Sequence, residues 1–151
     1  MSQSYTYPYP RPMVTVDAVI LRPGELETWE ILLIERGNPP FAGQWALPGG
    51  YLDMKEDLHT GAKRELVEET GLQVERPMTQ LGAYGDPKRD PRGRTITIAY
   101  GIVLTETEST QAVGGQDDAR AAAWHMVDQL PALAFDHAEI IAKGITTLLG
   151  R

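Results

Sequence analysis

Apolar and β-branched residues are concentrated in five short segments of the chain, separated by proline, glycine and charged residues. This pattern is typical of strands, which need only about five or six residues to cross a sheet. The five expected strands are residues 13–21, 29–34, 72–84, 94–104 and 121–127. Pro23 and Gly24 separate the first two, which we expect to pair, and Pro77 is expected to interrupt the third.

Two other segments follow a helical pattern. Residues 55–70 contain no proline, are rich in charged helix formers and stop before Gly71, a residue type that commonly follows a helix C-terminus. In the second segment, Asp136 followed by Glu139 predicts a capping pair at the helix start. The expected apolar stripe of that helix consists of Ala138, Ile141, Ala142, Ile145, Leu148 and Leu149.

The remaining segments carry too many proline, glycine and polar residues for regular structure. We expect a loop over residues 36–50, a basic turn over 86–93 and an acidic loop over 105–118. Strands mixed with two helices in this order predict an α+β fold, with helices packed on a mixed sheet. Tyrosine and proline alternate over residues 1–12, which favours an extended N-terminal arm. The arm is either a tail or a segment that lays its tyrosines on a partner subunit.

Composition narrows the class of protein. A chain of 151 residues with 42% hydrophobic content has the size of one domain, here residues 13–151. The formal net charge of −7 disfavours a binder of nucleic acid or of anionic membranes. The sequence has no cysteine, which excludes disulfides and thiolate catalysis. Neither a membrane-spanning run nor a secretory signal is recognisable, so we expect a soluble cytoplasmic protein.

Three carboxylates fall close together on the first expected helix. At about 100° per residue, Glu65, Glu68 and Glu69 lie within about 100° of arc. Like charges about 4 Å apart repel by about 4 kcal/mol at an effective dielectric constant of 20, and one guanidinium, that of Arg64, cannot neutralise three acids. A ligand set made only of oxygen atoms favours Mg²⁺ or Mn²⁺, and hence phosphate chemistry. The competing interpretation is a solvated, charged helix face.

The spacing around these carboxylates decides between the two interpretations. Residues 50–72, GYLDMKEDLHTGAKRELVEETGL, place a glycine, a glutamate, an Arg-Glu-aliphatic run, a Glu-Glu pair and a Gly-aliphatic pair at fixed intervals. A chance match at one start point has a probability on the order of 10⁻⁹ or less at average amino-acid usage. The string resembles the signature of the Nudix hydrolase family. The likeness extends over residues 13–149 and implies an α/β/α sandwich with a mixed central sheet.

The resemblance also implies an activity and a set of site residues. The activity is metal-dependent hydrolysis of a nucleoside diphosphate linked to another moiety. The implied metal ligands are the carbonyl of Gly49 with Glu65, Glu68 and Glu69, and the implied orienting residues are Arg64 and Glu56. A water positioned by a carboxylate would then attack one phosphorus. Asp118 and Glu68 are the first candidates for that carboxylate; the others are Glu69, Glu106, Glu108 and Asp117.

Residues outside the signature must select the substrate. Residues 82–104 and the stretch FDHAEII resemble the ADP-ribose pyrophosphatase subgroup, which implies ADP-ribose as substrate, AMP and ribose 5-phosphate as products, and a homodimer. The expected phosphate-binding residues are Arg89, Arg92 and Arg94, although the basic turn could equally be a solvated hairpin tip. Phe41 is a candidate for stacking on the base. The three histidines are expected to be packing or surface residues.

Two other functions remain open. One is removal of oxidised nucleoside triphosphates, with release of pyrophosphate. The other is a non-catalytic sensor of ADP-ribose, which the complete acidic signature and the expected absence of an appended winged helix disfavour.

Overall fold

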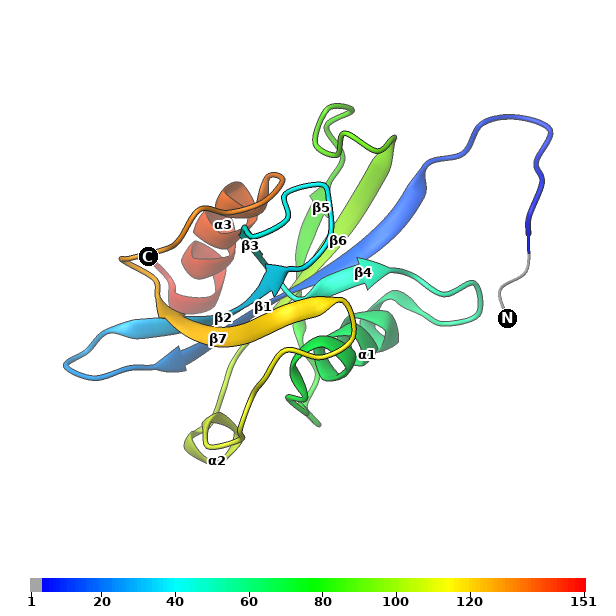
Figure 1. The fold of residues 1–151 in the computed structure, drawn as a ribbon. Helices are drawn as coiled ribbons and strands as arrows, with labels where there is room; N and C mark the ends of the chain where they lie inside the picture. Colours follow the sequence, from blue (N-terminus) through cyan, green and yellow to red (C-terminus); the bar gives the residue numbers. More distant parts are fainter. Residues whose placement is uncertain (1–3) are drawn as a thin grey trace.

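The structure is a computed structural model that describes residues 4–151. Within these residues, seven strands and three helices follow one another (Figure 1). In chain order they are β1 (Met13–Pro23), β2 (Trp29–Arg36), β3 (Trp45–Ala46), β4 (Gly49–Tyr51), α1 (Leu58–Thr70), β5 (Thr79–Tyr84), β6 (Thr95–Val103), α2 (Glu106–Ser109), β7 (Ala119–Met126) and α3 (His137–Leu149). The strands form one sheet in the order β3-β2-β1-β6-β5, to which β7 is added beside β2 and β4 beside β1.

Strand β1 is at the centre of the sheet and contributes to two apolar cores. It pairs antiparallel with β2 and parallel with β6, so the sheet is mixed. Because side chains alternate along a strand, Val16 and Ile20 belong to one core and Val19 and Leu21 to the other. All four side chains are fully buried. A sheet with two buried faces needs a cover on each side.

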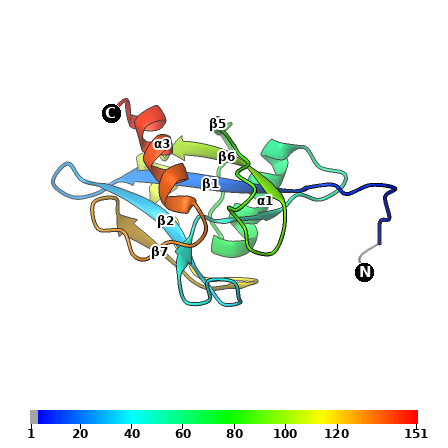
Figure 2. The same cartoon turned by 90° about the horizontal axis from the view of Figure 1, so that it is seen from above.

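Helices α1 and α3 provide these covers from opposite faces (Figures 1 and 2). Leu66 of α1 packs in the core that contains Val16. Ile140 and Ile141 of α3 pack in the core that contains Val19. The expected sandwich of helices on a mixed sheet is therefore confirmed.

Helix α3 differs from the expectation in two details. Ala138 and Ala142 are exposed, whereas Ile140 and Gly144 are buried, so the apolar stripe is rotated from the predicted one. Asp136 occupies the N-cap position but makes no side-chain capping bond. The predicted capping pair with Glu139 is therefore wrong, because both carboxylate oxygens of Asp136 accept hydrogen bonds from another part of the chain.

The proline- and glycine-rich segment 36–50 contains two short strands that the sequence did not indicate. β3 pairs with β2, and β4 pairs with residues 15–17 of β1. Tertiary pairing overrides the local preference for a loop here. Glycine at position 49 permits the close approach of β4 to β1, since a Cβ there would overlap the carbonyl oxygen of Val16.

Other boundaries shift for identifiable reasons. α1 begins at Leu58 rather than at residue 55, because Asp57 caps the helix by accepting from the Thr60 amide at 2.9 Å. β5 begins at Thr79, and residues 72–78 form no strand. The acidic loop contains the short helix α2, which starts with a capping box. The end of α1 at Gly71, with a φ of 80°, agrees with the prediction.

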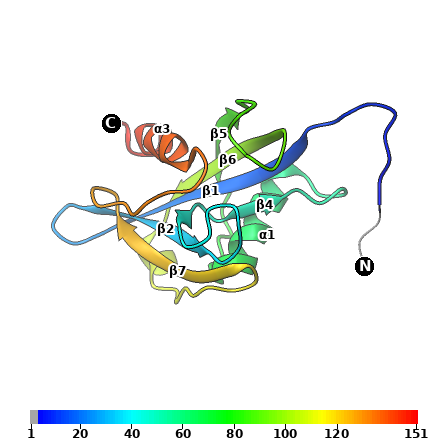
Figure 3. The same ribbon diagram turned by 45° about the horizontal axis from the view of Figure 1, so that its top comes forward.

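Residues 4–12 form neither helix nor strand and run away from the sheet at the start of β1 (Figure 3). Tyr9 is largely exposed, and the guanidinium of Arg11 stacks 3.7 Å from the centre of the Tyr7 ring. Residues 1–3, the first part of the expected arm, lie outside the described residues. Over residues 4–151, no helix combines the length and the apolar character that a membrane span requires.

Candidate active site

A cleft of about 410 Å³ opens beside β4, near the start of β1 and the end of β2. One wall is acidic and comes from α1 and the turn before β7. A basic wall comes from the end of β2, which pairs with the start of β7, and from the loop between β5 and β6. The lining residues are Thr15, Ile34, Arg36, Gly37, Asn38, Gly49, Gly50, Tyr51, Asp53, Glu65, Glu69, Arg92, Asp117 and Asp118.

Helix α1 forms the acidic wall. Glu65 and Glu69 are buried and line the cleft, whereas the Glu68 side chain is 43% exposed. Gly61 lies at the end of the first turn of this helix, and glycine within a helix costs up to about 1 kcal/mol relative to alanine. A Cβ there would come within 2.8 Å of Leu52 Cδ1 and 2.9 Å of Glu56 Oε1. Glycine therefore allows the preceding loop, and Glu56 with it, to pack against the helix.

The guanidinium of Arg64 connects the acidic residues to one another. It donates to Glu56 at 2.7 Å and 2.9 Å, to Glu65 at 2.9 Å and to Glu68 at 3.0 Å. It also donates to the carbonyl oxygen of Tyr51 at 3.1 Å. The hydrogen bonds from Arg64 hold the pKa of Glu56 below its usual value. Glu56 and Arg64 thus fix the exposed edge of α1 against the chain that leads out of β4.

Glu69 stands apart from this network. Its Oε1 accepts from the amide of Gly49 at 2.7 Å. Burial, which this bond only partly offsets, raises the pKa of Glu69 to about 8, and the nearby charges of Glu65, Asp17 and Asp117 act in the same direction. Burial also raises the pKa of Glu65. The protein surroundings therefore do not compensate the full negative charge of this wall, and without a cation Glu69 largely keeps its proton at neutral pH.

The donor chemistry of this wall fits a divalent cation. In the part of the chain that the structure describes, no three acidic or histidine side chains converge as a ready metal site. Glu65 and Glu68 are engaged by Arg64, and Glu69 by Gly49. The atoms that could bind a metal here are all oxygens. Glycine at position 50 leaves room beside the Glu65 carboxylate, because a Cβ at this position would come within 2.6 Å of it. A cation must therefore compete with existing hydrogen bonds for its ligands.

Two arginines form the basic wall. Arg92 receives ring contacts from both sides, with its guanidinium carbon 5.5 Å from the centres of the Tyr51 and Phe135 rings. Asp90, which is buried, holds the same guanidinium through two hydrogen bonds. Arg36 donates to the Pro40 carbonyl oxygen at 2.7 Å and also contacts Phe135. Both arginines line the cleft, and burial together with the charge of Arg92 lowers the pKa of Arg36.

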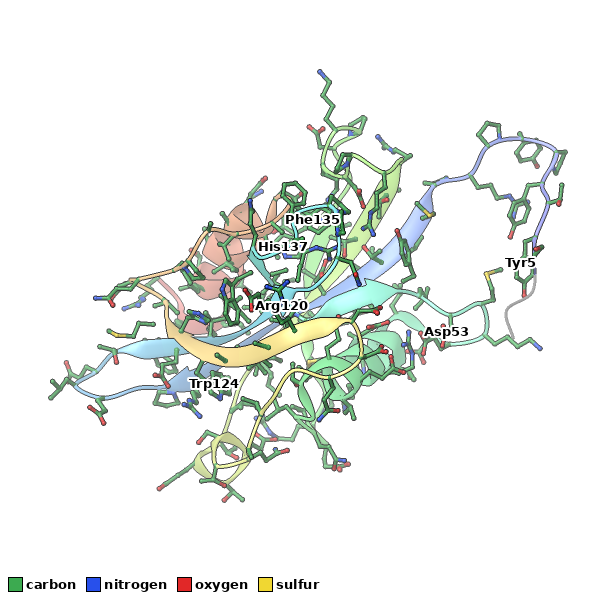
Figure 4. All side chains as sticks on the ribbon, viewed as in Figure 1. Tyr5, Asp53, Arg120, Trp124, Phe135 and His137 are labelled. Carbon is green, nitrogen blue, oxygen red and sulfur yellow. The ribbon has the colours of Figure 1, made fainter. Side chains whose placement is uncertain are left out.

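The structure does not bring the other expected substrate-binding residues to the cleft. The Arg89 side chain is only 4% exposed and donates to both oxygens of Asp136, at 2.7 Å and 2.9 Å. Arg94 is exposed outside the set of lining residues. Phe41 packs edge-to-face on Phe135, with 4.8 Å between the ring centres. Phe135 and His137 lie close together where the chain enters α3, whereas Asp53 lies just after β4, well away from both (Figure 4).

The candidates for the water-activating carboxylate separate into two groups. Asp117 and Asp118 line the cleft, and Glu68 is exposed beside it. Glu108 is occupied, since Arg76 and the Thr105 amide donate to it and lower its pKa to about 2. Glu106 lies with Glu108 in α2, away from the lining residues.

Arg36 is the cleft residue that the sequence reasoning missed. It directly follows the apolar run of β2 and precedes the proline-rich loop. The sequence signal for Arg36 is a charged residue at the end of an apolar strand, shortly before the segment that contains Gly49. Residues 36–50 are expected to form a loop, so the sequence does not show which residues of this segment pair with β1.

Comparisons with known proteins show which family and which relatives the sequence of this chain resembles. The NUDIX domain family model matches residues 11–144. An ADP-ribose pyrophosphatase of Methanocaldococcus jannaschii is 39% identical over 137 residues, which cover 88% of this chain and 73% of that protein. The ADPR responsive transcriptional repressor NtrR of Acinetobacter baylyi is 35% identical over 147 residues. The alignment covers 93% of this chain but 56% of the repressor, so the chain spans about half the repressor's length.

Solved structures show the same fold. A MutT/nudix family protein from Enterococcus faecalis superposes with a TM-score of 0.84 at 29% identity, covering 98% of this chain and 66% of that one. The NUDIX domain of Shewanella oneidensis NrtR, solved with ADP ribose, gives a TM-score of 0.79 at 33% identity, covering 89% and 87%. Nudix hydrolases generally use divalent metal ions. With the family model matching most of its length, the chain belongs to the Nudix family and is a hydrolase of pyrophosphate bonds.

Proposed function

We propose that this hydrolase cleaves the diphosphate of ADP-ribose, giving AMP and ribose 5-phosphate, with Mg²⁺ or Mn²⁺ as its cation. The observation that carries the proposal is a single cleft that is lined both by the carboxylates of Glu65 and Glu69 and by the guanidiniums of Arg36 and Arg92. A diphosphate with a bound cation presents charges of both signs to such a cleft. The 39% identity to an ADP-ribose pyrophosphatase supports the choice of substrate.

The acidic wall would hold the cation through Glu65, Glu68 and Glu69 and the carbonyl of Gly49. A divalent cation at this place supplies charge neutralisation of the diphosphate and a lower pKa for a bound water. Arg64 has a different task in the proposal. Its hydrogen bonds keep Glu65 and Glu68 on one edge of α1, so that both remain near the cleft when a cation competes for them.

The basic wall would orient the substrate. An arginine offers two parallel N–H donors to a phosphate, and the rings of Tyr51 and Phe135 restrict the guanidinium of Arg92 to one place. We assign the phosphate contacts to Arg36 and Arg92, which line the cleft, and a supporting task to Arg89. The carboxylate that positions the attacking water is Asp118, which lines the cleft, or Glu68, which is exposed on α1 one residue before Glu69.

Product identity tests this proposal. The purified protein would be incubated with ADP-ribose, other nucleotide sugars, dinucleotides and nucleoside triphosphates, each with Mg²⁺ or Mn²⁺, and the products separated by chromatography. We expect ADP-ribose to give AMP and ribose 5-phosphate with the highest kcat/KM. Release of inorganic pyrophosphate from an oxidised nucleoside triphosphate, with ADP-ribose intact, would instead assign the alternative triphosphatase activity.

A second function is supported by the NtrR repressor, which matches 93% of this chain, and by the NUDIX domain of Shewanella oneidensis NrtR, which covers 89% of it and was crystallised with ADP ribose. In that case the cleft would bind ADP-ribose as a signal. Calorimetry in the presence of a chelator separates the two functions. Tight binding of ADP-ribose without metal-dependent turnover would identify a sensor.

We also propose that the arm of residues 4–12 contacts a second copy of the chain. It runs away from its own domain, and Tyr9, Met13 and Met54 expose apolar surface around its base. Light scattering of the full chain and of a variant that lacks residues 1–12 tests this. We expect a dimer for the first and a monomer for the second; two monomers would refute the proposal.

A further inference from the structure

His137, at the start of α3, is a buried histidine whose contacts the proposed reaction does not use. Its side chain is about 5% exposed. Its Nδ1 accepts a hydrogen bond from the backbone amide of Leu47 at 2.9 Å. The acceptor must be an unprotonated ring nitrogen, so the ring is neutral and carries its proton on Nε2. This Nε2 lies 3.8 Å from Oδ1 of Asp17 on β1.

The segment that His137 holds is the one that leads to the expected metal-binding carbonyl. Leu47, Pro48 and Gly49 connect β3 to β4. The Leu47 amide donates to His137, the Pro48 carbonyl accepts from the Ala18 amide at 2.9 Å, and the Gly49 amide donates to Glu69. Both N–H groups of this segment therefore have a side-chain acceptor, since proline has no N–H.

These three attachments come from three different elements. α3 holds the segment through His137, β1 through Ala18 and α1 through Glu69. Only the contact with Glu69 would be disturbed by a cation that takes this carboxylate as a ligand. At that moment the attachments through α3 and β1 are what keep the segment in place.

We infer that His137 is a positioning residue that fixes the backbone of residues 47–49, so that the Gly49 carbonyl stays aimed at the cation when Glu69 turns to bind it. The bond to Leu47 acts through the backbone and does not touch the substrate. This inference rests on the proposed metal-dependent hydrolysis, since it assigns a task to the same site. It gives α3, which lines no part of the cleft, a direct connection to the metal-binding wall.

The chain offers a matched pair of substitutions. Asparagine and leucine have nearly the same shape, but only asparagine carries an oxygen, placed near the position of Nδ1, that can accept from the Leu47 amide. His137→Asn should therefore keep the bond, and His137→Leu should lose it. If His137→Leu does not fold, His137→Gln replaces it, because the longer side chain places its oxygen near Nε2 instead.

Asp136→Asn is the control for general loosening of the helix start. Asp136 precedes His137 and is held by Arg89, on a different loop, whereas the hydrogen bonds of Leu47, Pro48 and Gly49 go to His137, Ala18 and Glu69. This variant weakens the attachment of α3 without removing the acceptor for the Leu47 amide.

Two measurements need no substrate. Amide hydrogen exchange of the metal-free proteins reports the bond to Leu47, and titration with MnCl₂ followed by calorimetry reports the metal site. We expect His137→Leu to exchange faster at residues 47–49 and to bind Mn²⁺ about tenfold more weakly, the usual effect of losing a group that supports a ligand. His137→Asn should remain within about threefold of the unaltered protein, and Asp136→Asn should bind Mn²⁺ as tightly as that protein does.

Hydrolysis then adds a kinetic signature. The leucine variant should lose kcat at a given Mn²⁺ concentration while the KM for the substrate stays the same. Equal Mn²⁺ affinity of the leucine and asparagine variants would overturn the inference, and so would an equal loss in the Asp136 control. If the unaltered protein binds Mn²⁺ but cleaves a compound other than ADP-ribose, the proposed substrate fails, whereas the exchange and binding results still decide the task of His137.

Discussion

The two walls of the cleft are built in different ways. The acidic wall comes largely from one helix, and Arg64 connects Glu56, Glu65 and Glu68 within a short stretch of chain. The basic wall joins Arg36 and Arg92 through Phe135, so it depends on three segments that are far apart in the sequence. Local helix geometry is sufficient for the first wall, whereas the second exists only once the whole sandwich has formed.

The walls also differ in how their charge is balanced. Each basic side chain already has a carbonyl, a carboxylate or a ring against it. Glu69 has one amide for compensation and a pKa raised to about 8. The acidic wall therefore depends on a cation from outside for its function, and the basic wall depends on the folded protein.

The largest expected effect comes from breaking the acidic wall with Glu69→Gln. Glutamine keeps the size of the side chain and an oxygen for the Gly49 amide, but it removes a charged metal ligand. We expect kcat to fall about 10³-fold, which corresponds to about 4 kcal/mol of lost transition-state stabilisation. Steady-state kinetics with saturating Mg²⁺ measures this. The melting temperature in a chelator should not fall, because Glu69, with a pKa of about 8, is largely neutral there without a cation, as glutamine is.

Glu75→Gln is the matched control for this change. Glu75 is exposed, and its carbonyl oxygen, rather than its side chain, accepts from Lys63. The substitution removes the same charge from the protein at a place outside the cleft. Near-normal turnover of Glu69→Gln, or an equal loss in Glu75→Gln, would mean that the acidic wall has been assigned to the wrong residues.

The next effect concerns the support of the basic wall. Asp136→Asn leaves the almost fully buried guanidinium of Arg89 without its charged partner. We expect the free energy of unfolding to fall by about 2 kcal/mol, somewhat less than for a fully buried pair because Asp136 retains some exposure and asparagine still accepts a hydrogen bond. Urea denaturation measures it. Lys143→Gln, which removes an exposed pair with Glu139 on the same helix, should cost less than about 0.5 kcal/mol. Similar losses in both variants would show that the Arg89 pair is not a special support.

The same contrast explains how much could be predicted from the sequence. The five longer strands, apart from their exact bounds, both long helices, the acidic edge of α1 and the contact of Arg64 with Glu68 follow from periodicity or from the i, i+4 geometry of a helix. Arg92 was predicted to bind substrate from its positive charge alone, and it does line the cleft.

The remainder depends on contacts between distant segments. Arg89 and Arg92 have the same chemistry and lie three residues apart, yet one is buried on Asp136 and the other faces the cleft. The sequence does not distinguish them, because the choice depends on where α3 begins relative to the β5–β6 loop. Arg36 was missed for the same reason, since only the tertiary fold brings it near Arg92. His137 was expected to be a packing or surface residue and is buried, but the sequence does not show that its partner is the Leu47 amide.

Within the basic wall, Arg92→Lys tests whether the planar guanidinium itself matters. Lysine keeps the charge but loses the paired donors and much of the contact with Tyr51 and Phe135. We expect the KM for ADP-ribose to rise about tenfold while kcat changes less than about threefold, the signature of lost ground-state binding. Arg94→Lys is the matched control, because Arg94 is exposed and lines no part of the cleft. An equal rise in KM for both variants would show that the place of Arg92 in the cleft is not what matters, and no rise in either would show that the positive charge alone is sufficient.

The smallest expected effect is a dependence of stability on pH that comes from His137. Burial lowers the pKa of His137, which the charge of Asp17 and then that of Asp136 oppose, while Arg89 and Arg36 lower it further. The unfolded chain takes up a proton on this histidine near pH 6.5, whereas the folded protein does so only at lower pH. Below about pH 6.5 the unfolded state therefore binds more protons, and acid destabilises the fold.

His137→Asn isolates this contribution. Every other titrating group is present in both proteins, including the buried carboxylates whose raised pKa values act in the opposite direction. The difference in the free energy of unfolding between the two proteins should change between pH 7.5 and pH 5.5 with a slope of at most about 1.4 kcal/mol per pH unit, the limit for one proton. The original protein should lose stability faster than the variant as the pH falls. A difference that does not vary with pH would show that His137 titrates alike in both states, and that the hydrogen bond from Leu47 is too weak to keep the ring neutral.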